Sequence, residues 1–136
     1  MNPSPAEATR SYSVPLPLVK PYFAYILLGI NIIVFILQSI TPDIVIDDVS
    51  ISPWTLYGAK INEFIVQGEY WRLITPMFLH ANLLHIAFNS YALYIFGTQV
   101  EAIFGRTRFI AIYFLAGIGG SVMSFIFSPH PSVGAS

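Results

Sequence analysis

The sequence predicts an all-α membrane protein, built as a polytopic bundle of transmembrane helices. Apolar residues make up 55% of the 136 residues and charged residues only 10%, whereas a soluble domain has about 25% charged residues. The charged residues also cluster, which leaves three long uncharged apolar stretches. Each of these stretches must be helical, because an open strand in hydrocarbon would leave its backbone groups unpaired.

The three predicted spans cover residues 22–40, 77–97 and 109–127. The first span is followed by Thr41-Pro42, and as a helix it would be roughly 28 Å long, against a hydrocarbon core of about 30 Å. The second follows Pro76, and the third is stopped by Pro129 and Pro131.

The remaining segments divide the chain into a tail and a membrane domain. Residues 1–21 are rich in Pro and Ser and are predicted to be a disordered cytoplasmic tail, and residues 22–136 form the membrane domain. Basic residues precede the first span and separate the second from the third: Arg10, Lys20, Arg106 and Arg108. Their position predicts a cytoplasmic N-terminus, which places the loops 41–72 and 128–133 on the outer side.

The outer loop 41–72 is partly apolar. Ile61, Phe64 and Ile65 have helical spacing, which indicates a short amphipathic segment at the interface; loose interfacial packing is the alternative. In the third span, Gly117 and Ser121 form a pair of small residues that lets two helices approach closely. Ordinary helix packing is the favoured interpretation of that pair.

The second span carries polar side chains, which are costly to place in an apolar helix and therefore indicate a specific role. At about 100° per residue, His85 and Asn89 lie about 40° apart on one face, with Asn82 nearby. His80 lies about 140° from His85 in a regular helix, or it precedes the regular helix. Three interpretations stay open here: polar contacts between helices, a metal site without a neighbouring carboxylate or thiol, and hydrogen-bond donors for a charge that develops in a reaction.

The last residues, Gly134-Ala135-Ser136, are similar to the front half of a nucleophile motif at a helix start. An ordinary loop serine is the alternative. The chain has no cysteine, which excludes disulfides and thiolate metal sites, and its net charge of −1 gives no reason to expect nucleic acid as a partner.

Taken together, these residues resemble the rhomboid family of intramembrane serine proteases, and most of all its bacterial members. The resemblance covers roughly residues 58–136. It rests on five ordered pieces: Gly68-Glu69-x-Trp71-Arg72, Phe78-Leu79-His80, His85-x-x-x-Asn89, Gly97-x-x-x-Glu101-x-x-x-Gly105-Arg106 and Gly134-Ala135-Ser136.

The resemblance implies a bundle of six or seven spans, of which three are present, and cleavage of transmembrane helices in membrane proteins. It implies that Ser136 is the nucleophile and that His85 and Asn89 stabilise the oxyanion. Residues with structural or supporting roles would be His80, Trp71, Arg72, Glu101, Gly105 and Arg106. The implied partners are membrane-protein substrates and the lipid bilayer, the implied location is the cell membrane, and neither a cofactor nor a metal is implied.

One departure from the family pattern is that its general-base histidine belongs to a sixth helix, whereas this chain reaches only the start of a fourth. His130 is interpreted as a loop histidine. We therefore expect the 136 residues to be an N-terminal fragment that is inactive alone. Two alternatives are a non-catalytic rhomboid-like protein that binds membrane segments, and a fragment of a transporter or channel.

Overall fold

The protein is almost entirely helical in a computed structural model that describes residues 18–134. The longer helices are α1 (Tyr22–Ile40), α4 (Leu83–Ala92), α5 (Thr98–Phe104) and α6 (Arg106–Phe127). A π-helical turn, η3 (Leu93–Gly97), joins α4 to α5 without a gap. Shorter elements follow α1: the strands β1 (Ile44–Ile46) and β2 (Val49–Ile51), the helices α2 (Pro53–Gly58) and α3 (Asn62–Val66), and the 3-10 turns η1 (Tyr70–Leu73) and η2 (Thr75–Phe78).

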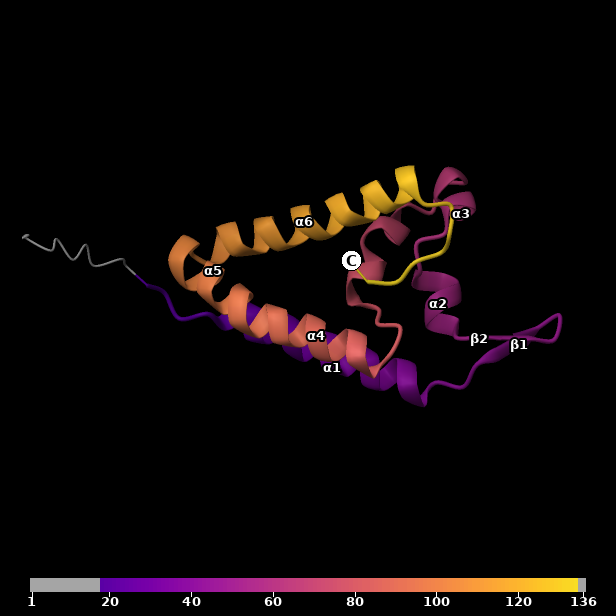
Figure 1. The fold of residues 1–136 in the computed structure, drawn as a ribbon, viewed down its shortest axis with the longest axis horizontal. Helices are drawn as coiled ribbons and strands as arrows, with labels where there is room; N and C mark the ends of the chain where they lie inside the picture. The colour runs from indigo at the N-terminus through magenta and orange to yellow at the C-terminus, as the bar shows by residue number, and fades with distance from the viewer. Residues whose placement is uncertain (1–17, 135–136) are drawn as a thin grey trace, which may run out of the picture.

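The long helices form two limbs that are joined at one end (Figure 1). In one limb, α1 runs antiparallel to the continuous helical segment from α4 to α5 and contacts α4, η3 and α5. The other limb is α6, which turns back after α5 and diverges from the first limb. The segment from α2 to η2 lies at the open end, between the limbs. A core of Ala24, Leu27, Leu93 and Phe109 lies where α1, η3 and α6 meet.

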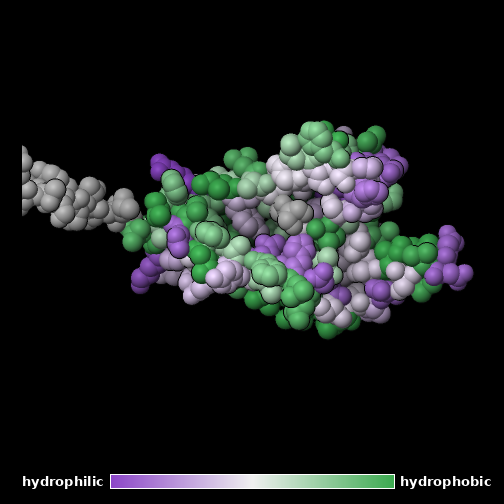
Figure 2. Space-filling view, in the orientation of Figure 1, coloured by the Kyte–Doolittle hydropathy of each residue, from purple (hydrophilic) through white to green (hydrophobic). Residues whose placement is uncertain are grey.

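Two helices are long and apolar enough to cross a membrane within residues 18–134, namely α1 and α6. The predicted bounds of the first span, 22–40, match α1, and the third predicted span ends with α6 at Phe127. The α6 helix starts three residues earlier than predicted, because Gly105, at a φ of 83°, turns the chain directly from α5 into α6. Apolar side chains cover much of the face in Figure 2, as expected for a chain in lipid.

The second predicted span, 77–97, differs from the structure at both ends. Its helix begins at Leu83, because Asn82 adopts an extended conformation and its side chain accepts a hydrogen bond from the His85 N–H. The helix also continues beyond Gly97, through η3 and α5 to Phe104. The count of three spans therefore stays a prediction. Besides α1 and α6, the helical segment 83–104 is the candidate for the remaining span.

The outer loop contains an antiparallel hairpin that sequence reasoning missed. Ile44 pairs with Ile51 and Ile46 with Val49. The two residues between the strands, Asp47 and Asp48, have φ values of 50° and 63°, as the tight two-residue turns of hairpins require. The predicted amphipathic segment around Ile61, Phe64 and Ile65 corresponds to α3, in which Ile65 is buried. Of the predicted tail, residues 1–17 lie outside the described residues, and Val19 donates a hydrogen bond to the Ala102 carbonyl at 3.0 Å.

The carboxylate of Glu101 caps the start of α1. It is fully buried, and it accepts hydrogen bonds from the backbone N–H groups of Phe23 (3.0 Å) and Ala24 (2.7 Å). The first N–H groups of a helix have no partner within it, and a negative charge there is also favoured by the helix dipole. Next to this cap, the guanidinium of Arg106 lies over the Tyr22 ring at 4.8 Å. Glu101, Gly105 and Arg106 thus lie where α5, α6 and the start of α1 meet, and their expected supporting role stays a prediction.

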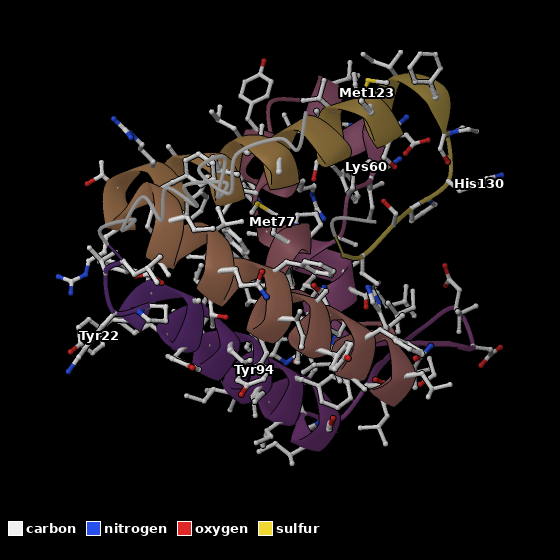
Figure 3. The ribbon with its side chains drawn as sticks, turned by 60° about the vertical axis from the view of Figure 1, so that its left-hand side comes forward. Tyr22, Lys60, Met77, Tyr94, Met123 and His130 are labelled. Atoms are coloured by element: carbon white, nitrogen blue, oxygen red, sulfur yellow. The ribbon has the colours of Figure 1, made fainter. Side chains whose placement is uncertain are left out.

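The ammonium of Lys60 caps the opposite end of the fold, at the end of α6. Lys60 is fully buried and donates to the carbonyls of Ser124 (3.3 Å) and Ser128 (2.8 Å), and Figure 3 shows it close to α6. Its backbone pairs with Ser132 in an isolated antiparallel bridge. Burial lowers the pKa of Lys60, and the Glu63 carboxylate opposes that shift. These contacts tie the chain after α6 to the outer loop.

The small residues of α6 receive a loop segment rather than another long helix. A Cβ atom on Gly117 would overlap the Met77 side chain of η2, and Figure 3 shows Met77 between the two limbs. Met77 and Ser121 are both buried. The close approach predicted for the Gly117 and Ser121 pair is therefore present, and its partner is η2.

We predict that Glu101→Gln will destabilise the fold by about 1–3 kcal/mol, because the amide removes the charge and one of the two acceptor oxygens. Equilibrium unfolding in mixed micelles measures this loss. The control is Glu63→Gln, which makes the same chemical change at an exposed residue. Equal stability of the two variants would contradict the capping role.

Candidate functional site

The site forms where the segment before α4 and the chain after α6 approach each other, at the open end between the limbs (Figure 1). In Figure 2 a hydrophilic patch lies in the middle of the otherwise largely apolar face, near that point. Three polar side chains from residues 80–89 meet here: His80, His85 and Asn89.

His80 is held by α1 before the α4 helix begins. The His80 N–H donates to Gln38 Oε1 at 3.1 Å, and Gln38 Nε2 donates back to the His80 carbonyl at 3.4 Å. The His80 side chain is buried, and the ring edge of Phe35 packs against it. A single glutamine side chain therefore satisfies both backbone groups of a residue outside regular secondary structure, as burial of those groups requires.

The turn between η2 and α4 returns His80 to the face that carries His85 and Asn89. Asn89 Nδ2 lies 3.3 Å from His80 Nε2, and the His80 and His85 rings are 5.2 Å apart. With the Asn89 amide oriented as in the structure, His80 Nε2 is the acceptor, because an amide nitrogen only donates. In a regular helix His80 would have pointed away, so the predicted position ahead of the helix is what permits these contacts.

His85 has one occupied and one free ring nitrogen. Its Nδ1 accepts a hydrogen bond from the Ala81 N–H at 3.3 Å. A backbone N–H can only donate, so in a neutral imidazole the proton must be on Nε2. The Nε2 atom is buried and has no partner among the described residues. His85 therefore presents an unpaired N–H donor, and an unpaired buried donor carries a free-energy cost that a ligand or intermediate could relieve.

Gly134 places the end of the described chain against this donor. It has a φ of 86°, its N–H donates to the Pro76 carbonyl at 2.8 Å, and a Cβ atom at this residue would overlap the His85 ring. Glycine is required here both by the left-handed backbone and by the close approach. The predicted nucleophile Ser136 follows two residues later and lies outside the described residues.

Asn89 also faces a cavity of about 330 Å³ between the two limbs. Met77, Leu93, Tyr113 and Gly117 share in its lining. One amide hydrogen of Asn89 points at His80, and its amide carries a second one. The polar group is thus next to a space that can hold a ligand or water, which is a typical setting for a binding site.

Of the outer-loop pair, Arg72 is internal and Trp71 is exposed. Arg72 forms an ion pair with Glu69, donates to the Ala59 carbonyl at 3.0 Å and stacks on the Phe64 ring at 4.7 Å. It therefore holds the outer loop together. Trp71 has half of its surface exposed and donates weakly to the Tyr57 carbonyl. The supporting roles expected of the two residues stay predictions.

Sequence reasoning missed Gln38 and Lys60 as contributors to the site. Gln38 lies within the first predicted span, and a glutamine within a span is itself a signal of a specific polar contact. No sequence pattern indicates the contacts of Lys60 with the end of α6. His130 is exposed in the loop after α6 and lies at its outer edge in Figure 3. Within residues 18–134, no three His, Cys, Asp or Glu side chains gather as a metal site would require.

Much of this sequence is shared with known proteins. The Rhomboid domain matches residues 67–136. The rhomboid protease GluP of Bacillus subtilis is 45% identical over 117 residues, which is 86% of this chain and 22% of that protein. The RHOMBOID-like protein 9 of Arabidopsis thaliana, described as chloroplastic, is 51% identical over 79 residues, or 58% of this chain and 18% of that protein.

A third relative, the putative rhomboid protease YdcA of Bacillus subtilis, is 39% identical over 89 residues, which cover 64% of this chain and 45% of that protein. The chain thus spans about a fifth of the length of the first two relatives and less than half of the third. The matched domain includes all the contacts between His80, His85, Asn89 and Gly134. The chain belongs to the rhomboid family.

Proposed function

We propose that this chain carries the nucleophile side of the active site of an intramembrane serine endopeptidase, which cleaves transmembrane helices of membrane proteins. The observation that carries the proposal is the Nε2–H of His85, which has no partner among the described residues and lies beside Gly134. Consecutive Cα atoms are 3.8 Å apart, so Ser136 Cα lies within about 7.6 Å of Gly134 Cα. The serine thus follows closely on the residue that packs against the His85 ring, and acyl transfer needs a nucleophile near such a donor.

The proposed roles follow from the donors at the site. Attack of the Ser136 hydroxyl on a peptide carbonyl would create a negatively charged tetrahedral intermediate. His85 Nε2–H and the second Asn89 amide hydrogen are neutral donors that can bind this charge without a permanent buried ion. His80 would then position Asn89, and Gln38 would position His80. A donor of this kind is worth about 3–4 kcal/mol in the transition state.

The proposed nucleophile, Ser136, needs a general base. We assign that role to none of the three histidines of this chain. His80 Nε2 contacts Asn89 and His85 Nδ1 is occupied by Ala81, while the His130 side chain is exposed in a loop. Because the relatives are much longer, we propose that a later helix of a longer protein supplies the base, and that the 136 residues alone are inactive.

We also propose a location and an orientation in the cell membrane. The basic residues Lys20 and Arg106 lie near the start of α1 and the junction of α5 with α6, which are at the same end of the fold (Figure 1). That end would face the cytoplasm by the distribution of positive charge. The site and the outer loop lie toward the other end, so cleavage would occur near the outer face.

We predict that the product of the complete reading frame will react with a fluorophosphonate probe at Ser136. Ser136→Ala should remove the label, because the probe bonds to an activated serine. The control is Ser128→Ala, which should keep the label because only backbone groups of Ser128 are used in the described contacts. Equal labelling with and without Ser136 would contradict the nucleophile assignment, and no labelling of the unaltered protein would favour the non-catalytic alternative.

A second prediction concerns Asn89→Ala in the same protein. We expect kcat for a transmembrane substrate to fall about 100- to 1,000-fold, because the lost donor acts on charge that exists only in the transition state. KM should change little for the same reason. Ser90→Ala is the matched control one residue away. Unchanged kcat in Asn89→Ala would remove this residue from the oxyanion role.

A third prediction concerns Gly134→Ala. The new Cβ atom would overlap the His85 ring and would also require an unfavourable φ, so the loop should shift by a substantial fraction of an ångström. We expect kcat to fall on the order of 100-fold, as misplacement of reacting groups does. Gly119→Ala is the control, since a Cβ atom there meets nothing within 4 Å. Comparable rates for both variants would contradict the close approach of Gly134 to His85.

A further inference from the structure

A separate cavity of about 510 Å³ lies between α1, α2 and η2, and neither Gly134 nor His85 lines it. Its walls are mainly apolar side chains, among them Val34, Trp54, Tyr57, Phe78 and Leu79. Gly58 forms part of the wall, where a Cβ atom would lie 2.9 Å from Leu79 Cδ1. The volume is that of a site for a small molecule.

Two polar groups of the wall, on Trp54 and Thr75, already have partners within the protein. The Thr75 hydroxyl donates to the Gly58 carbonyl at 2.7 Å. The Trp54 indole N–H donates to Thr41 Oγ1 at 2.9 Å. Neither group is free to bind a polar ligand, because each would have to give up its present hydrogen bond. The chemistry of the cavity therefore fits a hydrocarbon chain.

The cavity is continuous with the apolar surface of a candidate membrane span. Val34 lies on α1 between Ile30 and Leu37, which share its face at helical spacing and are each 39% exposed. The α1 helix is one of the two candidate spans. The hydroxyl-bearing ring of Tyr57 is 68% exposed beside the cavity, and tyrosine and tryptophan prefer the level of the lipid headgroups.

We propose that this cavity is a binding site for one acyl chain of a phospholipid, with the headgroup beside Tyr57. The proposal rests on the membrane location of the family and not on the protease assignment. Phe78 and Leu79 directly precede His80, so a chain in the cavity would pack behind the segment that carries the polar site. The bound lipid would thereby support the position of His80 through Phe78 and Leu79.

Native mass spectrometry of the protein, purified in mild detergent from membranes, tests this site. We expect one phospholipid per chain to remain bound after extensive washing. Val34→Phe, which fills the cavity, should reduce the retained lipid at least fivefold. Ile33→Phe is the matched control, because Ile33 is 59% exposed on the same helix and does not line the cavity; it should retain the lipid. No retained phospholipid, a free fatty acid or detergent in its place, or equal retention in both variants would overturn the proposal.

Tryptophan fluorescence gives a measurement that does not depend on Val34→Phe folding correctly. The fluorescence of Trp54 is the part of the signal that disappears in Trp54→Phe, and that of Trp71 is the part that disappears in Trp71→Phe. In vesicles that contain a phospholipid with brominated acyl chains, Trp54 fluorescence should be quenched at a lower mole fraction of brominated lipid than Trp71 fluorescence. Trp54 lines the cavity, whereas Trp71 is exposed outside it. Identical quenching curves for the two tryptophans would show only general contact with lipid and would contradict a bound chain.

Discussion

Unpaired backbone groups at helix ends are the constraint on which this structure depends. A helix leaves its first N–H and last carbonyl groups without partners, and a largely apolar chain has little water to supply them. Here a buried carboxylate, Glu101, serves the start of α1, and a buried ammonium, Lys60, serves the end of α6. Each charge has the sign that the helix dipole favours at its end. Glu101 thus joins α5 to α1 within one limb, and Lys60 joins the outer loop to the end of α6, the other limb.

The polar site depends on the same constraint at a smaller scale. Residues 79–82 leave regular structure between η2 and α4, so their backbone groups need partners from side chains. Gln38 satisfies His80, and Asn82 satisfies the N–H of His85. These contacts orient the two imidazoles and leave His85 Nε2 as a free donor. An irregular backbone within an apolar frame is tolerated where the protein itself supplies the hydrogen bonds.

Local features of the fold could be predicted from the sequence, and contacts between distant segments could not. The bounds of α1 follow from an uncharged apolar stretch that ends at Thr41-Pro42, and α6 ends where Pro129 and Pro131 follow. His85 and Asn89 could be placed on one helix face by their spacing alone. The approach of Gly134 to His85, the caps by Glu101 and Lys60, and the contact of Met77 with Gly117 join residues far apart in the chain. No periodicity connects such pairs, so the structure was needed to find them.

The π-helical turn has a consequence for which side chains share a direction. Asn89 and Glu101 are twelve positions apart, which in an unbroken α-helix would put them about 120° apart around the axis. A π turn inserts one extra residue, and this leaves an offset of about 20° at the α-helical rotation per residue. The carboxamide that contacts His80 and the carboxylate that contacts the start of α1 can thus both point inward from a single rod. The π turn Leu93–Gly97 thus sets the rotation about the helix axis so that two polar clusters, one toward each end of the same helix, lie on one side.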